Sequence, residues 1–143
     1  MGWHHSWGIG SRSKIATLKD PWPEILDKVL SRCPFDLTVV WAHRGRLAQD
    51  RAFAAGNSTK QWPDSLHNDD PSPATDLAPY IDGQIDWGEK DHGRRYYILA
   101  GVVLGVAAEY PDIELRWGGD WDRDGDLDDQ SFIDLGHFEI RPA

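Results

Sequence analysis

"SLHNDDPSPATDLAPY", from Ser65 to Tyr80, is the stretch that decides the fold, because a polar loop there runs into a predicted buried strand. His67 stands before a loop rich in acids, serine and proline, and Asp76 follows nine positions later, beside Leu77. The apolar and β-branched neighbours of Asp76 predict a strand over "ATDLAP" with the carboxylate near its middle. A turn in the loop is expected to bring the imidazole and the carboxylate to one edge of a sheet.

Three helices are predicted along the chain. The first begins at Asp20, which can cap it, and Pro21 suits the first helical position. Its apolar residues recur at helical spacing and form one stripe. The second helix, "RLAQDRAFAAG" from Arg46, ends at Gly56, a residue that can take the left-handed conformation found after helices. The third covers residues 96–110 and stops before a proline.

Strand patterns separate these helices. Residues 35–43, "FDLTVVWAH", are rich in β-branched and aromatic side chains, and "IELRW" at 113–117 and "FIDLGHFEI" at 132–140 complete the set. Helices and strands do not alternate as regular βαβ units. The sequence therefore predicts an α+β fold with a small antiparallel or mixed sheet flanked by helices. The length fits a single domain over 1–143, of which residues 1–17 are expected to be an N-terminal arm.

Charge and hydropathy exclude some partners. The formal net charge is −9, and "DWDRDGDLDD" alone holds six aspartates between Asp120 and Asp129. A nucleic-acid partner is not expected, because phosphate binding needs a basic face and none is visible. The longest apolar run, residues 96–108, is too short to cross a bilayer, so no membrane insertion is expected. The opening residues lack the apolar segment of a signal peptide.

Two histidines and one aspartate form a candidate metal site. A hydrolytic zinc ion takes three protein ligands and keeps one position open, and His67, Asp76 and His137 supply suitable donors. Asp134 precedes His137 by three residues, where a carboxylate can serve as general base. From the residues alone the alternative stays open, since histidines satisfied in the core or on the surface are common.

The order of these motifs adds a family resemblance. Ser-x-His, then an aspartate in an apolar strand, then Asp-x-x-His-Phe-Glu in the final strand, resembles the phage endolysins of the VanY-like peptidase family, over nearly the whole chain. These are L-alanyl-D-glutamate peptidases and D-alanyl-D-alanine carboxypeptidases with the hedgehog-type zinc fold. The likeness implies that zinc is held by three side chains of this sequence: His67, Asp76 and His137.

The same resemblance implies roles for three further residues. Asp134 matches the catalytic acid or base, Arg44 the arginine that orients substrate five residues before a helix glutamine (here Gln49), and Ser65 the serine two residues before the first ligand. Two features differ from the dipeptidase branch of the family: the loop between the first two ligands is two residues longer, and Asp134 replaces a glutamate. The alternatives are a surface salt bridge for Arg44 and a capping hydroxyl for Ser65.

The acidic stretch raises a second metal hypothesis. Asp120, Asp122 and Asp124, followed by glycine, match the first half of a calcium-binding loop. Ser131 stands where a standard EF-hand has its bidentate glutamate, so a calcium ion would need Asp126 or a later aspartate to complete its ligands. A solvated acidic loop is the alternative.

The leading hypothesis is a zinc-dependent peptidoglycan peptidase, a phage lysis enzyme that cuts the L-Ala-D-Glu bond of the stem peptide. The first alternative is a D-alanyl-D-alanine carboxypeptidase with the same metal. The second is a non-catalytic module that binds cell wall or calcium on the same scaffold. We expect a monomer that is made in the host cytoplasm without a signal peptide and acts on the cell wall after release.

Overall fold

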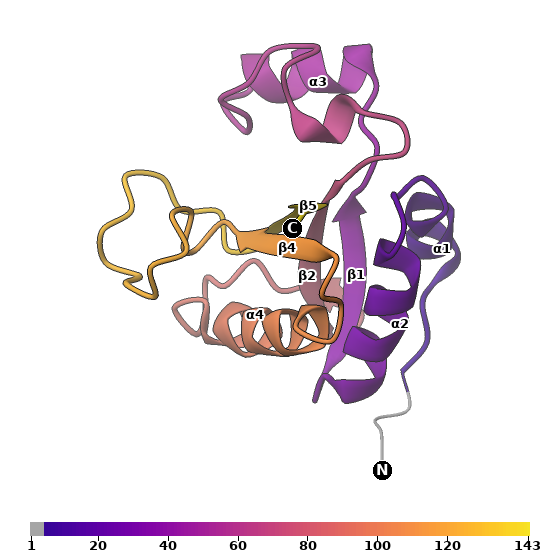
Figure 1. Cartoon of the computed structure of the whole chain (residues 1–143), viewed down its shortest axis with the longest axis vertical. Helices are drawn as coiled ribbons and strands as arrows, with labels where there is room; N and C mark the ends of the chain where they lie inside the picture. Colours follow the sequence, from indigo (N-terminus) through magenta and orange to yellow (C-terminus); the bar gives the residue numbers. More distant parts are fainter. Residues whose placement is uncertain (1–4) are drawn as a thin grey trace.

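In the computed structural model, which describes residues 5–143, four α-helices and one 3-10 turn surround an antiparallel sheet (Figure 1). The strand order is β1-β2-β5-β4, and β3 pairs with β2. The predicted α+β class with a small sheet flanked by helices is therefore confirmed. The elements are α1 (Ile9–Ile15), α2 (Trp22–Arg32), β1 (Asp36–Trp41), α3 (Arg46–Ala54), η1 (Leu66–Asn68), β2 (Ala74–Ile81), β3 (Gln84–Ile85), α4 (Arg94–Ala107), β4 (Ile113–Trp117) and β5 (His137–Pro142).

The strand predicted around Asp76 is β2, and it lies inside the sheet between β1 and β5. Its small and apolar residues Ala74, Leu77 and Ala78 are buried. In the antiparallel register, Asp76 lies opposite His137 of β5. The sheet itself therefore places a carboxylate and an imidazole, 61 residues apart in the chain, next to each other.

The apolar core lies between the sheet and two helices. The stripe predicted for the first helix is buried in α2, where Ile25, Leu26 and Val29 have no exposed surface. α2 packs against α4, and α4 against β2 and β4. Trp22 is also fully buried, and its indole N–H donates to the carbonyl of Pro73, 2.8 Å away. This bond ties the helix to the chain that enters β2.

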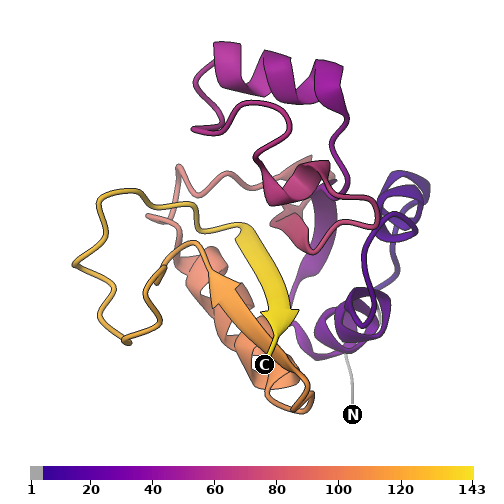
Figure 2. The ribbon, with the colours of Figure 1, turned by 45° about the horizontal axis from the view of Figure 1, so that its top comes forward.

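Helix α3 lies apart from this core, beyond the ends of the central strands, and Figures 1 and 2 show the separation from two directions. Its one buried residue is the polar Gln49. Gly56 follows the helix with a φ of 78°, the left-handed conformation that the sequence predicts for it. Among residues 5–143, no helix has the length and apolar character needed to cross a membrane.

The predicted irregular arm over residues 1–17 is wrong for part of its length, because residues 9–15 form α1. The sequence pattern did not predict this helix, because the helix is short and polar and lacks an apolar stripe. It is held by Ser11, whose hydroxyl accepts a hydrogen bond from the Val39 backbone N–H of β1 at 3.0 Å. Trp7, just before the helix, is buried in the core. Residues 1–4 of the predicted arm lie outside the described residues.

Some details also differ from the sequence prediction. α2 has Pro21 rather than Asp20 at its N-cap position and no side-chain cap. The two-residue strand β3 was not among the predicted strands. The final strand begins at His137, not at Phe132, because the chain from the acidic loop runs close to β4 before it pairs with β2.

Two glycines permit these close approaches. A Cβ on Gly136 would lie 2.6 Å from the carbonyl oxygen of Leu77, and one on Gly118 would lie 2.1 Å from the carbonyl oxygen of Asp134. Both contacts are with backbone, which cannot rotate away as a flexible side chain can. Gly136 and Gly118 therefore allow the segment 134–137 to lie against β2 and β4.

We predict that Gly136→Ala lowers the free energy of unfolding by about 1–3 kcal/mol, because the added methyl group forces the β2–β5 junction apart. The matched control is Gly101→Ala on α4, where a Cβ meets nothing within 4 Å. That substitution should raise stability by about 0.5–1 kcal/mol, since alanine is the better helix former. Urea denaturation of the three proteins measures both changes. Equal stability of Gly136→Ala and wild type would contradict the close approach.

Candidate active site

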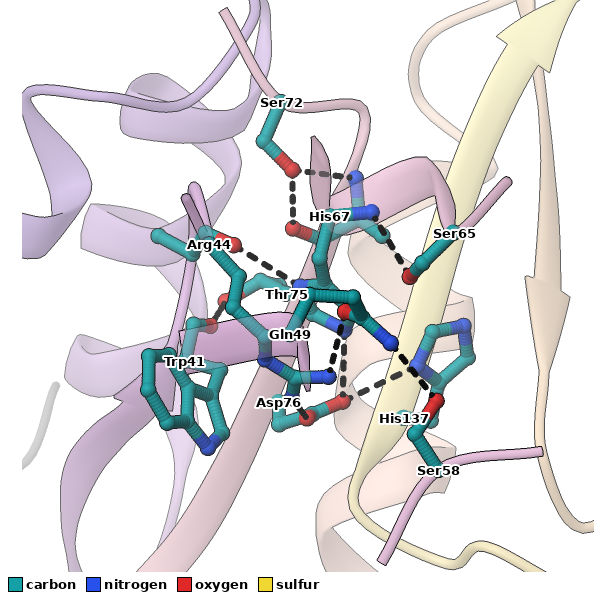
Figure 3. A network of polar contacts seen from close by, with 12 residues as sticks. Trp41, Arg44, Gln49, Ser58, Ser65, His67, Ser72, Thr75, Asp76 and His137 are labelled. Atoms are coloured by element: carbon teal, nitrogen blue, oxygen red, sulfur yellow. Dashed lines mark hydrogen bonds and ion pairs between the residues drawn. The ribbon is translucent and has the colours of Figure 1, made fainter. Parts of the chain in front are cut away.

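Three side chains from three separate elements converge beside the sheet. His67 lies in η1, Asp76 in β2, and His137 at the first position of β5. One donor atom of each lies within 4.8 Å of the other two, and Figure 3 shows both imidazoles directed at the Asp76 carboxylate. The structure therefore brings together the three residues that the sequence nominates as metal ligands.

The hydrogen bonds of His67 fit a metal ligand. Its Nδ1 lies 2.8 Å from the carbonyl oxygen of Ala42, which can only accept, so Nδ1 carries the proton. Nε2 is then a lone-pair donor; it is buried and makes no hydrogen bond within the described residues. It lies 3.3 Å from Oδ1 of Asp76. Two lone pairs that face each other repel unless a cation lies between them. The bond from Nδ1–H to a backbone carbonyl is also typical of a histidine that binds a metal through its other ring nitrogen.

His137 lies between two carboxylates. Nδ1 is 2.9 Å from Oδ1 of Asp76, and Nε2 is 2.9 Å from Oε1 of Glu139. Burial lowers the pKa of His137, but the hydrogen bonds to Asp76 and Glu139 outweigh it and raise the pKa to about 9. Glu139 is itself fixed by Arg116, whose Nη2 donates to Oε2 at 2.8 Å. Glu139 thus orients the ring so that Nδ1 faces the site, the usual arrangement of a carboxylate behind a histidine ligand.

Asp134 and Arg44 line the same cavity, of about 640 Å³, as the three candidate ligands. Asp134 is half-buried, and its carboxylate makes no hydrogen bond with any described residue. Burial and the nearby charge of Asp76 raise its pKa. Arg44 is buried, with Nη2 3.7 Å from Oδ2 of Asp76 and its guanidinium carbon 4.5 Å from the centre of the Trp41 ring. The surface salt bridge considered for Arg44 is therefore wrong.

Gln49 holds Arg44 in this position. Its Oε1 accepts from Nη1 of Arg44 and from Nδ2 of Asn68, each at 3.1 Å. Its Nε2 donates to the Ser58 hydroxyl at 3.0 Å and to the Lys60 carbonyl at 2.7 Å. All four hydrogen-bonding positions of the amide are thus used. Gln49 joins α3, the loop after it, the arginine and the turn that carries His67.

Ser65 has the capping role that the sequence left as an alternative. Its hydroxyl accepts from the backbone N–H of His67 at 3.2 Å, and the side chain of Asn68 completes a capping box with the Ser65 N–H. Ser65 also lines the cavity. The hydroxyl therefore orients the turn that presents His67, and its contact with substrate stays a prediction.

Only some of the aspartates in the acidic loop lie close together. Asp120, Asp122 and Asp124 offer oxygens within 4.8 Å of one another, whereas Asp126 is not in this group. Backbone amides of the loop already donate to Asp120, Asp124 and Asp126. The neighbouring Asp124 carboxylate raises the pKa of Asp129 to about 6. Calcium binding here stays a prediction.

The residues that support the site from behind were hard to predict from the sequence. Glu139 shares a strand face with His137, because side chains two apart on a strand point the same way, but its bond to the imidazole needs the three-dimensional register. Asn68 looks like an ordinary loop residue. Gln49 lies in a helix with a weak apolar face, and its burial is visible only in the structure.

We predict that Gln49→Leu lowers the free energy of unfolding by about 2–3 kcal/mol, because it leaves buried groups of Arg44 and Asn68 without partners. Gln61→Leu, an exposed site on the following loop, is the control and should change stability by less than about 0.5 kcal/mol. Thermal or urea unfolding gives both values. A loss at Gln49 no larger than at Gln61 would show that the network carries little energy.

Comparisons with known proteins bear on the family and the fold of this chain. The profile of the family described as phage L-alanyl-D-glutamate peptidase matches residues 3–141. The L-alanyl-D-glutamate peptidase of Escherichia phage T5 is 31% identical over 139 residues, covering 93% of this chain and 96% of that protein. The crystal structure of the Serratia marcescens L-Ala D-Glu endopeptidase ChiX has a similar fold, with a TM-score of 0.73 and 20% identity over 95% of this chain and 90% of the other. With its family profile matched almost from end to end, this chain belongs to the phage L-alanyl-D-glutamate peptidases.

Proposed function

We propose that this peptidase depends on zinc and hydrolyses the bond between L-alanine and D-glutamate in the peptidoglycan stem peptide. The observation that carries the zinc assignment is His67 Nε2, a buried lone-pair donor without a hydrogen bond, directed at a carboxylate and a second imidazole. Two imidazoles and one carboxylate are a donor set that catalytic zinc sites use. The enzyme would act on the cell wall after its release from the cell that makes it.

In this proposal His67, Asp76 and His137 hold the ion. When bound, zinc supplies a Lewis acid and makes water nucleophilic at neutral pH. Asp134, on the rim of the same cavity, accepts the proton of the attacking water and returns it to the nitrogen of the leaving amine. Arg44, fixed by Gln49 and Trp41, directs its guanidinium at the carbonyl or carboxylate oxygens of the peptide.

Two other functions remain as alternatives. A D-alanyl-D-alanine carboxypeptidase would use the same ligands on the end of the stem peptide. A non-catalytic wall-binding module would not need the unbonded Asp134 carboxylate beside the cluster. Digestion of purified peptidoglycan followed by mass spectrometry separates the three: release of a peptide that begins with glutamate supports the proposal, loss of one terminal alanine supports the carboxypeptidase, and no cleavage supports the binding module.

We predict that Asp134→Asn keeps one zinc ion per chain but lowers the rate of wall lysis by about 100-fold or more, since the amide cannot accept a proton. His67→Ala should lose both zinc and lysis. Asp112→Asn, at an exposed aspartate that does not line the cavity, is the matched control and should keep both. Metal analysis and a turbidity assay give the two readouts. Full lysis by Asp134→Asn would remove Asp134 from the mechanism.

The calcium hypothesis for the acidic loop makes a separate prediction. If Asp120, Asp122 and Asp124 bind the ion, millimolar calcium raises the melting temperature of wild type, because the ion relieves repulsion among these carboxylates. Asp122→Asn should abolish that rise and leave the zinc content unchanged. Identical melting curves with and without calcium would support the solvated loop instead.

A further inference from the structure

A second cavity, of about 870 Å³, adjoins the candidate active site and shares four lining residues with it: Arg44, Asn57, Asp76 and Asp134. Residues of α3, together with Trp87 and Ile133, line it as well. We call it the α3 pocket. Nothing in the catalytic proposal uses it, although a peptide that spans the scissile bond needs space on both sides.

Helix α3 and its C-terminal end present one face to this pocket. The residues of this face are Ala48, Arg51, Ala52 and Ala55, which follow the i, i+3, i+4, i+7 spacing of a single helical face. The alanines are short, so Arg51 is the only long side chain on the face. Within the described residues its guanidinium has no ion pair or hydrogen bond, whereas the neighbouring Arg46 lies 3.8 Å from Asp50.

Exposed apolar side chains also line the pocket. Trp87 is 62% exposed and Ile133 is 53% exposed. The backbone around Trp87 is nevertheless fixed through Asp86: its N–H donates to Pro79, its carboxylate accepts from the Gly88 N–H at 2.8 Å, and its carbonyl accepts from the Tyr96 hydroxyl at 2.7 Å. The fold thus holds an exposed indole at the rim of the pocket.

The two cavities differ in charge. Among residues 5–143, Arg51 is the one charged residue that lines the α3 pocket beyond the shared ones. The other cavity adds Lys60 and Arg116, with Arg116 paired to Glu139, and it also adds three unshared aspartates: Asp64, Asp122 and Asp129. An anionic part of a substrate is therefore favoured in the α3 pocket and disfavoured in the other cavity.

We propose that the α3 pocket is the subsite for the glutamyl residue on the C-terminal side of the scissile bond, and that Arg51 binds its free carboxylate. This inference rests on the proposed function. A glutamyl residue within a peptide chain uses one of its two carboxyl groups in the next peptide bond, so the other stays free and negatively charged. The alanine on the other side of the bond has no charged side chain. A guanidinium binds a carboxylate through two parallel hydrogen bonds, and Trp87 and Ile133 cover the adjacent methylene groups.

The test compares two synthetic peptides that contain the L-Ala-D-Glu bond and differ at one group, the free carboxylate of glutamate in one and its carboxamide in the other. Wild type should cleave the acid with the higher kcat/KM. Arg51→Ala should lower kcat/KM about tenfold for the acid and less than about twofold for the carboxamide, because only the acid loses a charged partner. Arg51→Lys should retain part of the preference, since lysine keeps the positive charge but cannot form the two parallel hydrogen bonds of a guanidinium.

Arg46→Ala is the matched control, because it removes the same charge from the same helix but from a residue outside the pocket. It should keep the wild-type preference. Equal losses on both peptides in Arg51→Ala, or an unchanged preference, would overturn the subsite assignment while cleavage by wild type leaves the peptidase proposal standing. Cleavage of neither peptide by wild type would overturn the proposed function itself, and the subsite with it.

Discussion

The pairing of β2 with β5 is the constraint on which the site depends. Asp76 lies opposite His137, and the next residue of β5, Phe138, is fully buried in the core. Because side chains alternate along a strand, burial of Phe138 and Ile140 directs His137 and Glu139 to the other face. A register shift of one residue would turn the imidazole toward the apolar core and the phenylalanine toward the polar site. The apolar core therefore selects the register that places Asp76 and His137 side by side.

The cluster concentrates ionisable groups where burial is unfavourable for each of them. Burial alone would raise the pKa of Asp76, but the neighbouring His137 and His67 imidazoles lower it well below its ordinary value. Arg44 shows the opposite balance: burial lowers its pKa, and the charge of Asp76 only partly offsets this. Removal of any one partner leaves the others as buried charges without compensation, which costs more than the pair itself contributes. The same groups become complementary around a divalent cation, which supports the assignment of the site as a metal centre.

How much of this was predictable depends on whether the signal was local. The buried stretch around Asp76 and the apolar stripe of α2 were predicted because their residues repeat at strand and helix spacing. α1 was missed because a short polar helix held by one serine has no such repeat. The start of β5 was misplaced because "FIDLG" has strand composition, yet Gly136 and the close backbone contacts of Gly118 set a different path. The order of the motifs in the sequence predicted that His67, Asp76 and His137 come together. The roles of Gln49 and Glu139 could not be predicted, because they depend on contacts between distant segments.

The position of α3 shows why polar contacts matter more here than apolar packing. The helix lies away from the main core, and its buried side chain is an amide rather than a hydrocarbon. Gln49 is saturated by partners from Arg44, Asn68 and the loop at 58–60. The bond from Arg44 to Gln49 holds the guanidinium, and the bonds to Asn68 and to the loop at 58–60 hold the helix, whose Ala48, Arg51, Ala52 and Ala55 line the same pocket as Arg44. Because hydrogen bonds are directional and apolar contacts are not, an amide specifies the separation of α3 from the sheet more narrowly than a leucine would. Gln49 thus holds both the helix that lines the α3 pocket and the arginine that this pocket shares with the candidate active site.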